Sequence, residues 1–140
     1  MSVDSNLELV KAMIRTVDLK DWERVPTYFT DSAIWSVPGA PGVSVTLKGI
    51  MEIWRADAVA FPDAKREVVA AFGEGDRACV EIIETGTHMG PMEHAGTMVP
   101  PTGKQFRIRV CAVLHISGGK ISEVHIYYDP LEPLAQLGIA

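Results

Sequence analysis

The chain has 140 residues, of which 47% are hydrophobic and 22% charged, and its formal net charge is -5. This balance fits one globular domain over residues 1–140 with a buried core. A mildly acidic chain with 13 lysines and arginines is poorly suited to binding nucleic acid through its phosphates. No apolar run approaches the ~20 residues of a membrane span, and the first six residues lack the pattern of a secretory signal. We therefore expect a cytoplasmic protein that binds neither nucleic acid nor membranes.

The N-terminal half has the periodicity of helices. Apolar side chains recur at helical spacing from Leu7 to Val17, and Asp4 and Ser5 before them are residue types that cap helices. Pro62 ends the last helical pattern, and residues 38–42 have a turn composition. The expected elements are a first helix through 7–17, a short helix over 21–29 capped by Asp21, a strand over Ala33–Val37 and a helix over Ile50–Phe61.

The C-terminal half has the alternation of β-strands. Gly73–Asp76 and Gly118-Gly119 are hairpin turn compositions that separate the strands of each pair. The expected elements are strands over Arg66–Phe72, Arg77–His88, Gln105–Ile116 and Lys120–Asp129, a loop over Met89–Lys104, and a short helix over Leu131–Leu137. Helices followed by antiparallel strands predict an α+β fold. A twisted sheet of this size curls, so the N-terminal helices can cover its concave side and leave an internal pocket.

The last hairpin decides which side chains face that pocket. A two-residue turn at Gly118-Gly119 with regular pairing sets Leu114 opposite Glu123 and Ala112 opposite His125. The same count sets Val110 opposite Tyr127 and Ile108 opposite Asp129, all on the inner face. The outer face then carries Val124, Ile126 and Tyr128. A bulge or a longer loop would exchange the two faces.

Asp129 has two interpretations. On the inner face its carboxyl would be partly desolvated, which raises the pKa toward the range useful for proton transfer. Alternatively, Asp129 followed by Pro130 and by Glu132 is the pattern with which a helix begins, so Asp129 would be a cap.

Several segments carry a resemblance to a known family over nearly the whole chain. They are Phe61-Pro62-Asp63, Thr85–Gly90, Pro100–Lys104, Gly119–Glu123, Tyr128-Asp129 and Gln136–Gly138. With these motifs the chain resembles the SnoaL-like polyketide (ester) cyclases, of the nuclear-transport-factor-2-like, cystatin-like superfamily. The resemblance implies helices packed on a curved, mostly antiparallel sheet that forms a cone, with no metal and no organic cofactor. It also implies that Asp129 is the acid/base residue of an intramolecular aldol condensation. This chain departs from the family by carrying His125 where an aromatic side chain is common.

Other candidate residues each have a structural alternative. His88 either faces the pocket as a catalytic hydrogen-bond partner or binds a loop backbone, and His125 depends on the register of the hairpin. Tyr127 is either a core aromatic or a hydrogen-bond donor to an oxyanion. Trp35 and Trp54 either pack in the core or stack on a ligand, and Trp35 could form a wall of the cavity. The set His88, Glu93 and His94 fits no familiar metal spacing, so we expect no metal site. The expected substrate contacts are Trp35, Trp54, Ile108, Val110, Ala112 and Tyr127.

Three functions follow from these observations. The first is a cofactor-independent cyclase or isomerase acting on a small hydrophobic carbonyl or ester compound through Asp129, assisted by His88 and His125. The second is ketosteroid isomerase or epoxide hydrolase chemistry, the latter requiring two carboxylates bridged by an arginine inside the pocket, a set that the sequence does not obviously supply. The third is a module that binds a small molecule or forms a dimer without chemistry. An outer face with Val124, Ile126 and Tyr128 would suit a homodimer.

Overall fold

The computed structural model describes residues 2–40 and 42–139, so the predicted turn at 38–42 lies partly outside the described residues. The helices are α1 (Val3–Asp18), the 3₁₀ turn η1 (Val25–Tyr28), α2 (Leu47–Ala60) and α3 (Leu131–Gln136). The strands are β1 (Phe29–Ser36), β2 (Val45–Thr46), β3 (Lys65–Glu74), β4 (Arg77–Thr87), β5 (Met92–His94), β6 (Thr97–Val99), β7 (Gln105–Ser117) and β8 (Lys120–Tyr127). Each of the described helices lies within or overlaps a segment that was predicted to be helical. None of them is both long and apolar enough to cross a membrane.

Two predicted helices differ in their details. The cap of α1 is Ser2, whose hydroxyl accepts a hydrogen bond from the Ser5 amide at 3.1 Å, while the Ser5 hydroxyl accepts one from the Ser2 amide. The predicted helix at 21–29 is only the short η1, because Phe29 already belongs to β1. Pro26 lies in the first turn of η1, where its missing amide hydrogen costs no hydrogen bond.

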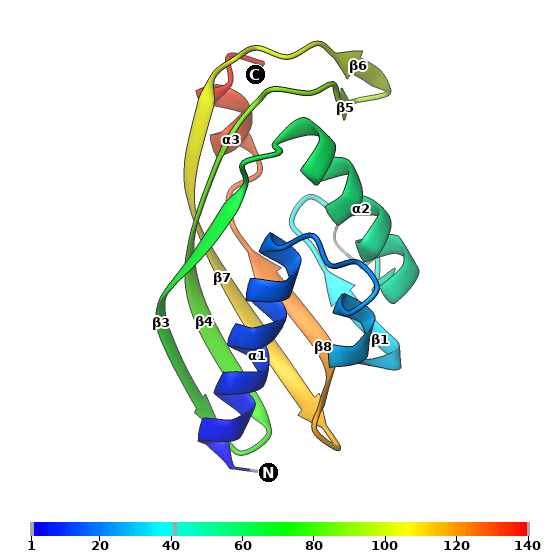
Figure 1. The fold of residues 1–140 in the computed structure, drawn as a ribbon, viewed down its shortest axis with the longest axis vertical. Helices are drawn as coiled ribbons and strands as arrows, with labels where there is room; N and C mark the ends of the chain where they lie inside the picture. The colour runs from blue at the N-terminus through cyan, green and yellow to red at the C-terminus, as the bar shows by residue number, and fades with distance from the viewer. Residues whose placement is uncertain (1, 41, 140) are drawn as a thin grey trace.

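Six strands form one curved sheet in the order β2-β1-β8-β7-β4-β3. All neighbours are antiparallel except β1 and β8, which run parallel, so the sheet is mixed but mostly antiparallel as expected. α1 and α2 lie across its concave side, and α3 lies beside the far end of β7 (Figure 1). The predicted loop at Met89–Lys104 contains a small separate hairpin, β5-β6.

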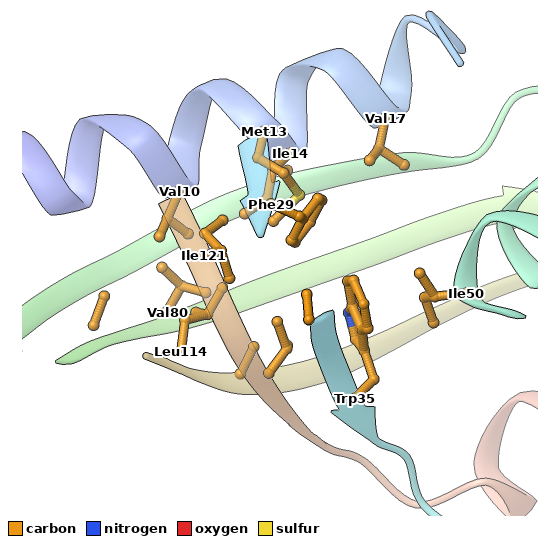
Figure 2. Close-up of a cluster of buried hydrophobic side chains, with 14 of the residues drawn as sticks. Val10, Met13, Ile14, Val17, Phe29, Trp35, Ile50, Val80, Leu114 and Ile121 are labelled. Atoms are coloured by element: carbon orange, nitrogen blue, oxygen red, sulfur yellow. The ribbon is translucent and has the colours of Figure 1, made fainter. Parts of the chain in front are cut away.

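The main core lies between α1 and the sheet. Val10, Met13, Ile14 and Val17 form the buried face of α1 and point toward the strands (Figure 2). Trp35 on β1 is fully buried and its ring centroid lies 4.8 Å from that of Phe29. Burial of such side chains stabilises the fold by roughly 1.5–3 kcal/mol each. A second cluster, under α3, contains Ala60, Phe61, Phe106, Ile108 and Leu137.

The β7-β8 hairpin has the predicted turn but not the predicted register. Ser117 pairs with Lys120, so Gly118-Gly119 is a two-residue turn, with φ values of 57° and 80° that glycine adopts without strain. Ser122 is then an extra residue, because Ile116 pairs with Ile121 whereas His115 pairs with Glu123. This β-bulge shifts every later pair by one position. The predicted pairing beyond Ile121 is therefore wrong, and the inner and outer side chains of β8 are exchanged.

Candidate active site

A cavity of about 280 Å³ lies between the helices and the concave face of the sheet. Its volume is at the lower end of the range for small-molecule sites. Most of its wall is aliphatic or aromatic, and among the described residues four side chains bring charge or a hydroxyl to it. The lining includes Val10, Met13, Ile14 and Val17 of α1, Ile50, Ile53, Trp54 and Asp57 of α2, Trp35, Val37 and Pro38, Arg66 of β3, Val80, Ile82 and Glu84 of β4, Val110, Ala112 and Leu114 of β7, and Val124, Ile126 and Tyr128.

The four polar side chains are Asp57, Arg66, Glu84 and Tyr128. The Arg66 guanidinium lies 3.1 Å from the Glu84 carboxylate and 3.0 Å from that of Asp18, which ends α1. Asp18 also accepts a hydrogen bond from the Arg66 backbone amide at 2.9 Å. An arginine held between two carboxylates is fixed in position, so it presents a constant positive charge to the cavity.

The Asp57 carboxyl has the environment of a proton-transfer group. Its pKa is raised from 3.8 to about 6, chiefly by burial and to a smaller extent by the negative charge of Glu84, while the positive charge of Arg66 opposes the shift. A carboxyl with this pKa accepts and returns a proton near neutral pH. Burial and the negative charges of Glu84 and Asp57 raise the pKa of the Tyr128 phenol. The phenol therefore stays protonated and remains a hydrogen-bond donor.

A second pocket, of about 260 Å³, adjoins this site. Asp57, Glu84 and Tyr128 line both spaces, so the polar side chains stand at the boundary between them. The second pocket is otherwise formed under the β5-β6 hairpin and α3. Its remaining lining is Phe61, Ala64, Met92, Glu93, His94, Phe106, Ile108, Pro130, Pro133, Leu134 and Leu137.

Four of the six expected substrate contacts line the cavity, namely Trp35, Trp54, Val110 and Ala112. Ile108 lines the second pocket and belongs to the core cluster under α3. Tyr127 is on the outer face with 58% of its surface exposed, because the bulge at Ser122 reverses its side of the sheet.

The expected catalytic residues are not brought together. His125 lies on the outer face, where its Nδ1 atom is 2.7 Å from the Ser36 hydroxyl. Asp129 is exposed, and its carboxylate accepts a hydrogen bond from the Leu131 amide at the start of α3, at 2.9 Å. The Asp129 carboxylate thus contacts the start of α3, although the N-cap of this helix is Pro130 and not Asp129 as the capping interpretation has it. Neither residue lines the cavity. The shifted register accounts for this in His125, whereas Asp129 lies beyond the end of β8.

His88 is fully buried at the end of β4 and lines neither pocket. Its Nδ1 atom accepts a hydrogen bond from the Thr102 amide at 3.2 Å and lies 3.0 Å from the Thr102 hydroxyl. The structure therefore matches the interpretation of His88 as a residue bonded to a loop backbone.

The predicted outer face of β8 is instead part of the cavity wall. Val124, Ile126 and Tyr128 all line the cavity, so they are not available to another copy of the chain as expected. The exposed apolar side chains of the outer face include Ile34, Phe72 and Tyr127. The homodimer itself stays a prediction.

Sequence reasoning missed Asp57, Arg66 and Glu84, although two of them carry a signal. Asp57 follows Ile50, Ile53 and Trp54 at helical spacing, so it occupies the same apolar face of α2. Glu84 follows Val80 and Ile82 at alternate positions of β4 and shares their inner face. A charged residue on an otherwise buried face is a sign of a functional site.

The segments that carry the family resemblance act mainly as scaffold. The Asp63 carboxylate accepts hydrogen bonds from the amide and hydroxyl of Thr87, both at 2.7 Å, and these bonds lower the pKa of Asp63. Gln136 binds the amide and carbonyl of Arg107 and so ties α3 to β7. A Cβ atom on Gly86 would come within 2.8 Å of the Phe106 ring. These motifs therefore specify the fold more than the substrate.

The family model described as SnoaL-like polyketide cyclase matches residues 7–137. The chain belongs to this family. The match covers α2, the whole curved sheet and α1 from Leu7 onward, so the family's cyclase-like character applies to this chain in a coarse sense, without fixing mechanism or substrate. A comparison with curated protein sequences found no match.

Solved structures share the SnoaL-like fold along their full length. AclR from Streptomyces galilaeus, a proposed hydroxylase, has a TM-score of 0.85 at 23% identity, with 99% of both chains covered. IdmH from Streptomyces antibioticus, a proposed polyketide cyclase, has a TM-score of 0.80 at 24% identity, with 95% of this chain and 98% of IdmH covered. A proposed polyketide cyclase from Acidithiobacillus ferrooxidans reaches 0.77 at 26% identity, covering 99% and 98%. At these identities the likeness establishes the fold.

Proposed function

We propose that the chain is a cofactor-independent cyclase-like enzyme that performs acid/base chemistry on a small hydrophobic carbonyl or ester compound bound in the cone. One observation carries this proposal. The Asp57 carboxyl faces an apolar cavity and has a pKa of about 6 because of its burial and of the nearby Glu84. Arg66 stabilises the negative charge of Asp57 only in part, so the carboxylate remains basic enough to remove an acidic carbon-bound proton.

The chemistry proposed for this site needs one proton-transfer group. The Asp57 carboxylate removes a proton from a carbon between two carbonyl groups, and the electron pair of the broken C–H bond forms an enolate. The enolate carbon attacks a ketone of the same molecule, so a C–C bond forms and the ketone oxygen becomes an alkoxide. Protonated Asp57 returns the proton to that oxygen. The Tyr128 phenol, which is protonated, donates a hydrogen bond to the enolate oxygen.

The apolar wall supports the same proposal through its shape. Trp35 and Trp54 stand with their ring planes at 89° and their centroids 6.0 Å apart, and both line the cavity. Flat, rigid walls of this kind hold a flexible chain in a folded conformation, which lowers the entropic part of the barrier to ring closure.

Proton transfer is tested directly by deuterium exchange. Ethyl benzoylacetate, whose acidic carbon lies between a ketone and an ester, is incubated in D₂O, and loss of its proton signal is followed by NMR. We expect acceleration by the wild type and a loss of roughly 100-fold or more in Asp57→Asn. Asp129→Asn is the matched variant, since it removes a carboxylate that lies outside the cavity.

The pair of variants separates the two aspartates. Loss of exchange in Asp129→Asn with full activity in Asp57→Asn would return the catalytic role to Asp129 and contradict our assignment. Equal slow exchange with and without wild-type protein would favour the small-molecule binding module instead.

A second candidate function rests on Arg66, which bridges the carboxylates of Asp18 and Glu84. Epoxide hydration requires an arginine between two carboxylates inside the pocket, and of these two carboxylates Glu84 lines the cavity whereas Asp18 does not. In that reaction a carboxylate takes a proton from water, and the water oxygen attacks an epoxide carbon. A protonated carboxyl gives its proton to the epoxide oxygen as the C–O bond breaks. Styrene oxide in ¹⁸O-labelled water is the second arm of the same experiment. Labelled diol formed only with protein would favour this function over the cyclase.

A further inference from the structure

A cluster of three metal-ligating side chains lies on the outer face of the sheet. It consists of His115 on β7 and of Glu123 and His125 on β8. One carboxylate oxygen of Glu123 lies 3.7 Å from His115 Nδ1, and the other lies 3.3 Å from His125 Nε2. One ligand atom from each residue lies within 4.8 Å of the other two.

The β-bulge assembles this cluster. Ser122 is the extra residue, and its hydroxyl donates a hydrogen bond to the His115 carbonyl at 3.2 Å. As a result Glu123 stands directly opposite His115, and His125 follows two residues later on the same face. Regular pairing would instead put Glu123 and His125 on the cavity side, away from His115. The sequence alone therefore conceals the site.

A fourth residue orients one of the imidazoles. Ser36 on β1 pairs with His125, and its hydroxyl lies 2.7 Å from His125 Nδ1. When Nδ1–H donates to this oxygen, the lone pair of Nε2 is directed away from Ser36, on the side of Glu123. A hydrogen bond from the second ring nitrogen is typical of histidines that bind metals, because it fixes the tautomer.

We propose that His115, Glu123 and His125 bind a divalent transition-metal ion of the zinc class. Two imidazole nitrogens and one carboxylate are donors that such ions favour over Mg²⁺ and Ca²⁺. With Zn–N bonds of about 2.0–2.1 Å, ligand atoms of a tetrahedral site lie about 3.3 Å apart. The distances of 3.7 Å and 3.3 Å to Glu123 are close to this value but run to different carboxylate oxygens, so rotations of the Glu123 carboxylate and of the two imidazoles are needed to bring one ligand atom of each residue to this separation.

Three protein ligands leave the fourth position of a tetrahedral ion to water. The three side chains are 25%, 35% and 30% exposed in chain order, so an ion can reach them without opening the fold. This site differs from the set His88, Glu93 and His94 considered in the sequence, where His88 is fully buried and bonded to Thr102. The proposed site is an alternative to our expectation that the chain has no metal site.

The site is independent of the proposed function. Val124, between Glu123 and His125, points to the opposite side of the sheet and lines the cavity. Removing the outer ligands therefore leaves the cavity wall in place, and the failure of either proposal has no bearing on the other.

The experiment titrates ZnCl₂ into the metal-free protein by isothermal calorimetry, with MgCl₂ as a second titrant. We expect one Zn²⁺ per chain and no saturable Mg²⁺ binding. His115→Ala, Glu123→Gln and His125→Ala should each weaken Zn²⁺ binding at least tenfold, and Ser36→Ala by about tenfold through loss of the orienting hydrogen bond. His94→Ala is the control, since it removes a histidine outside the cluster.

A spectroscopic readout identifies the ligands. Cu²⁺ bound to the wild type should give an EPR spectrum with coupling to two imidazole nitrogens, reduced to one in His125→Ala. Circular dichroism verifies that each variant is folded. Ser36→Ala keeps all three proposed ligands, so it tests the orienting hydrogen bond to His125 by itself. Absence of a one-to-one Zn²⁺ complex overturns the proposal. The proposal is also overturned if Zn²⁺ binding is unchanged in both His115→Ala and His125→Ala, or if it is lost in His94→Ala.

Discussion

Asp57 illustrates how a single residue can serve a site at the expense of stability. Its carboxyl has a pKa of about 6 in the folded chain and 3.8 as an isolated group, so the native state binds the proton more tightly than the unfolded state. Stability from this group is therefore greatest below pH 4 and is lost as the pH rises through the interval from 3.8 to 6.

Replacing this carboxyl with an amide should remove the penalty. At pH 7 we expect Asp57→Asn to raise the free energy of unfolding by about 2 kcal/mol, since each pKa unit corresponds to about 1.4 kcal/mol and partial exposure reduces the effect. At pH 4 the difference between variant and wild type should shrink. Urea denaturation at both pH values measures it. A variant that is less stable at pH 7 would mean that the charge of Asp57 is well compensated, and would weaken the case for its basicity.

At the scale of elements, the bulge in β8 is the feature that most affects function, and core substitutions report on it. Val124 is 3% exposed and Tyr127 is 58% exposed. Val124→Ala should cost about 2 kcal/mol of unfolding free energy, whereas Tyr127→Ala should change it by less than about 0.5 kcal/mol. Regular pairing of the hairpin predicts the reverse order. Thermal or urea unfolding of the two variants, compared at equal pH, therefore reads the register in solution.

The same strand shows what the sequence was able to predict. Gly118-Gly119 has a backbone requirement that only a tight turn satisfies, so the turn was predicted correctly. Ser122 carries no such signal, because a bulged serine and a paired one look alike in sequence. The helix periods located α1 and α2 to within a few residues. Asp57 was missed because the family resemblance points to the end of the last strand, whereas Asp57 is a polar residue within the apolar face of α2.

At the scale of the whole molecule, the cavity is the property that connects fold to function, and Ala112 is the place to close it. Ala112 is a small side chain on the cavity wall of β7. Ala112→Phe should fill much of the space and reduce the fluorescence enhancement of an apolar dye such as anilinonaphthalene sulfonate at least several-fold. Val113→Phe adds the same ring on the other face of β7 and should leave dye binding unchanged. Equal dye binding by both variants would place the dye site outside the cone.

The start of α1 and the helix α3 lie at opposite ends of the molecule's long axis (Figure 1). α1 begins beside the β3-β4 turn, with Asn6 donating a hydrogen bond to the Gly75 carbonyl, while Leu137 helps to form the second pocket. A protein immobilised through its first residues would therefore present that pocket to the solution. A fusion partner at the other end would crowd it. Attachment beside α1 therefore suits any assay that needs the second pocket open to the solution.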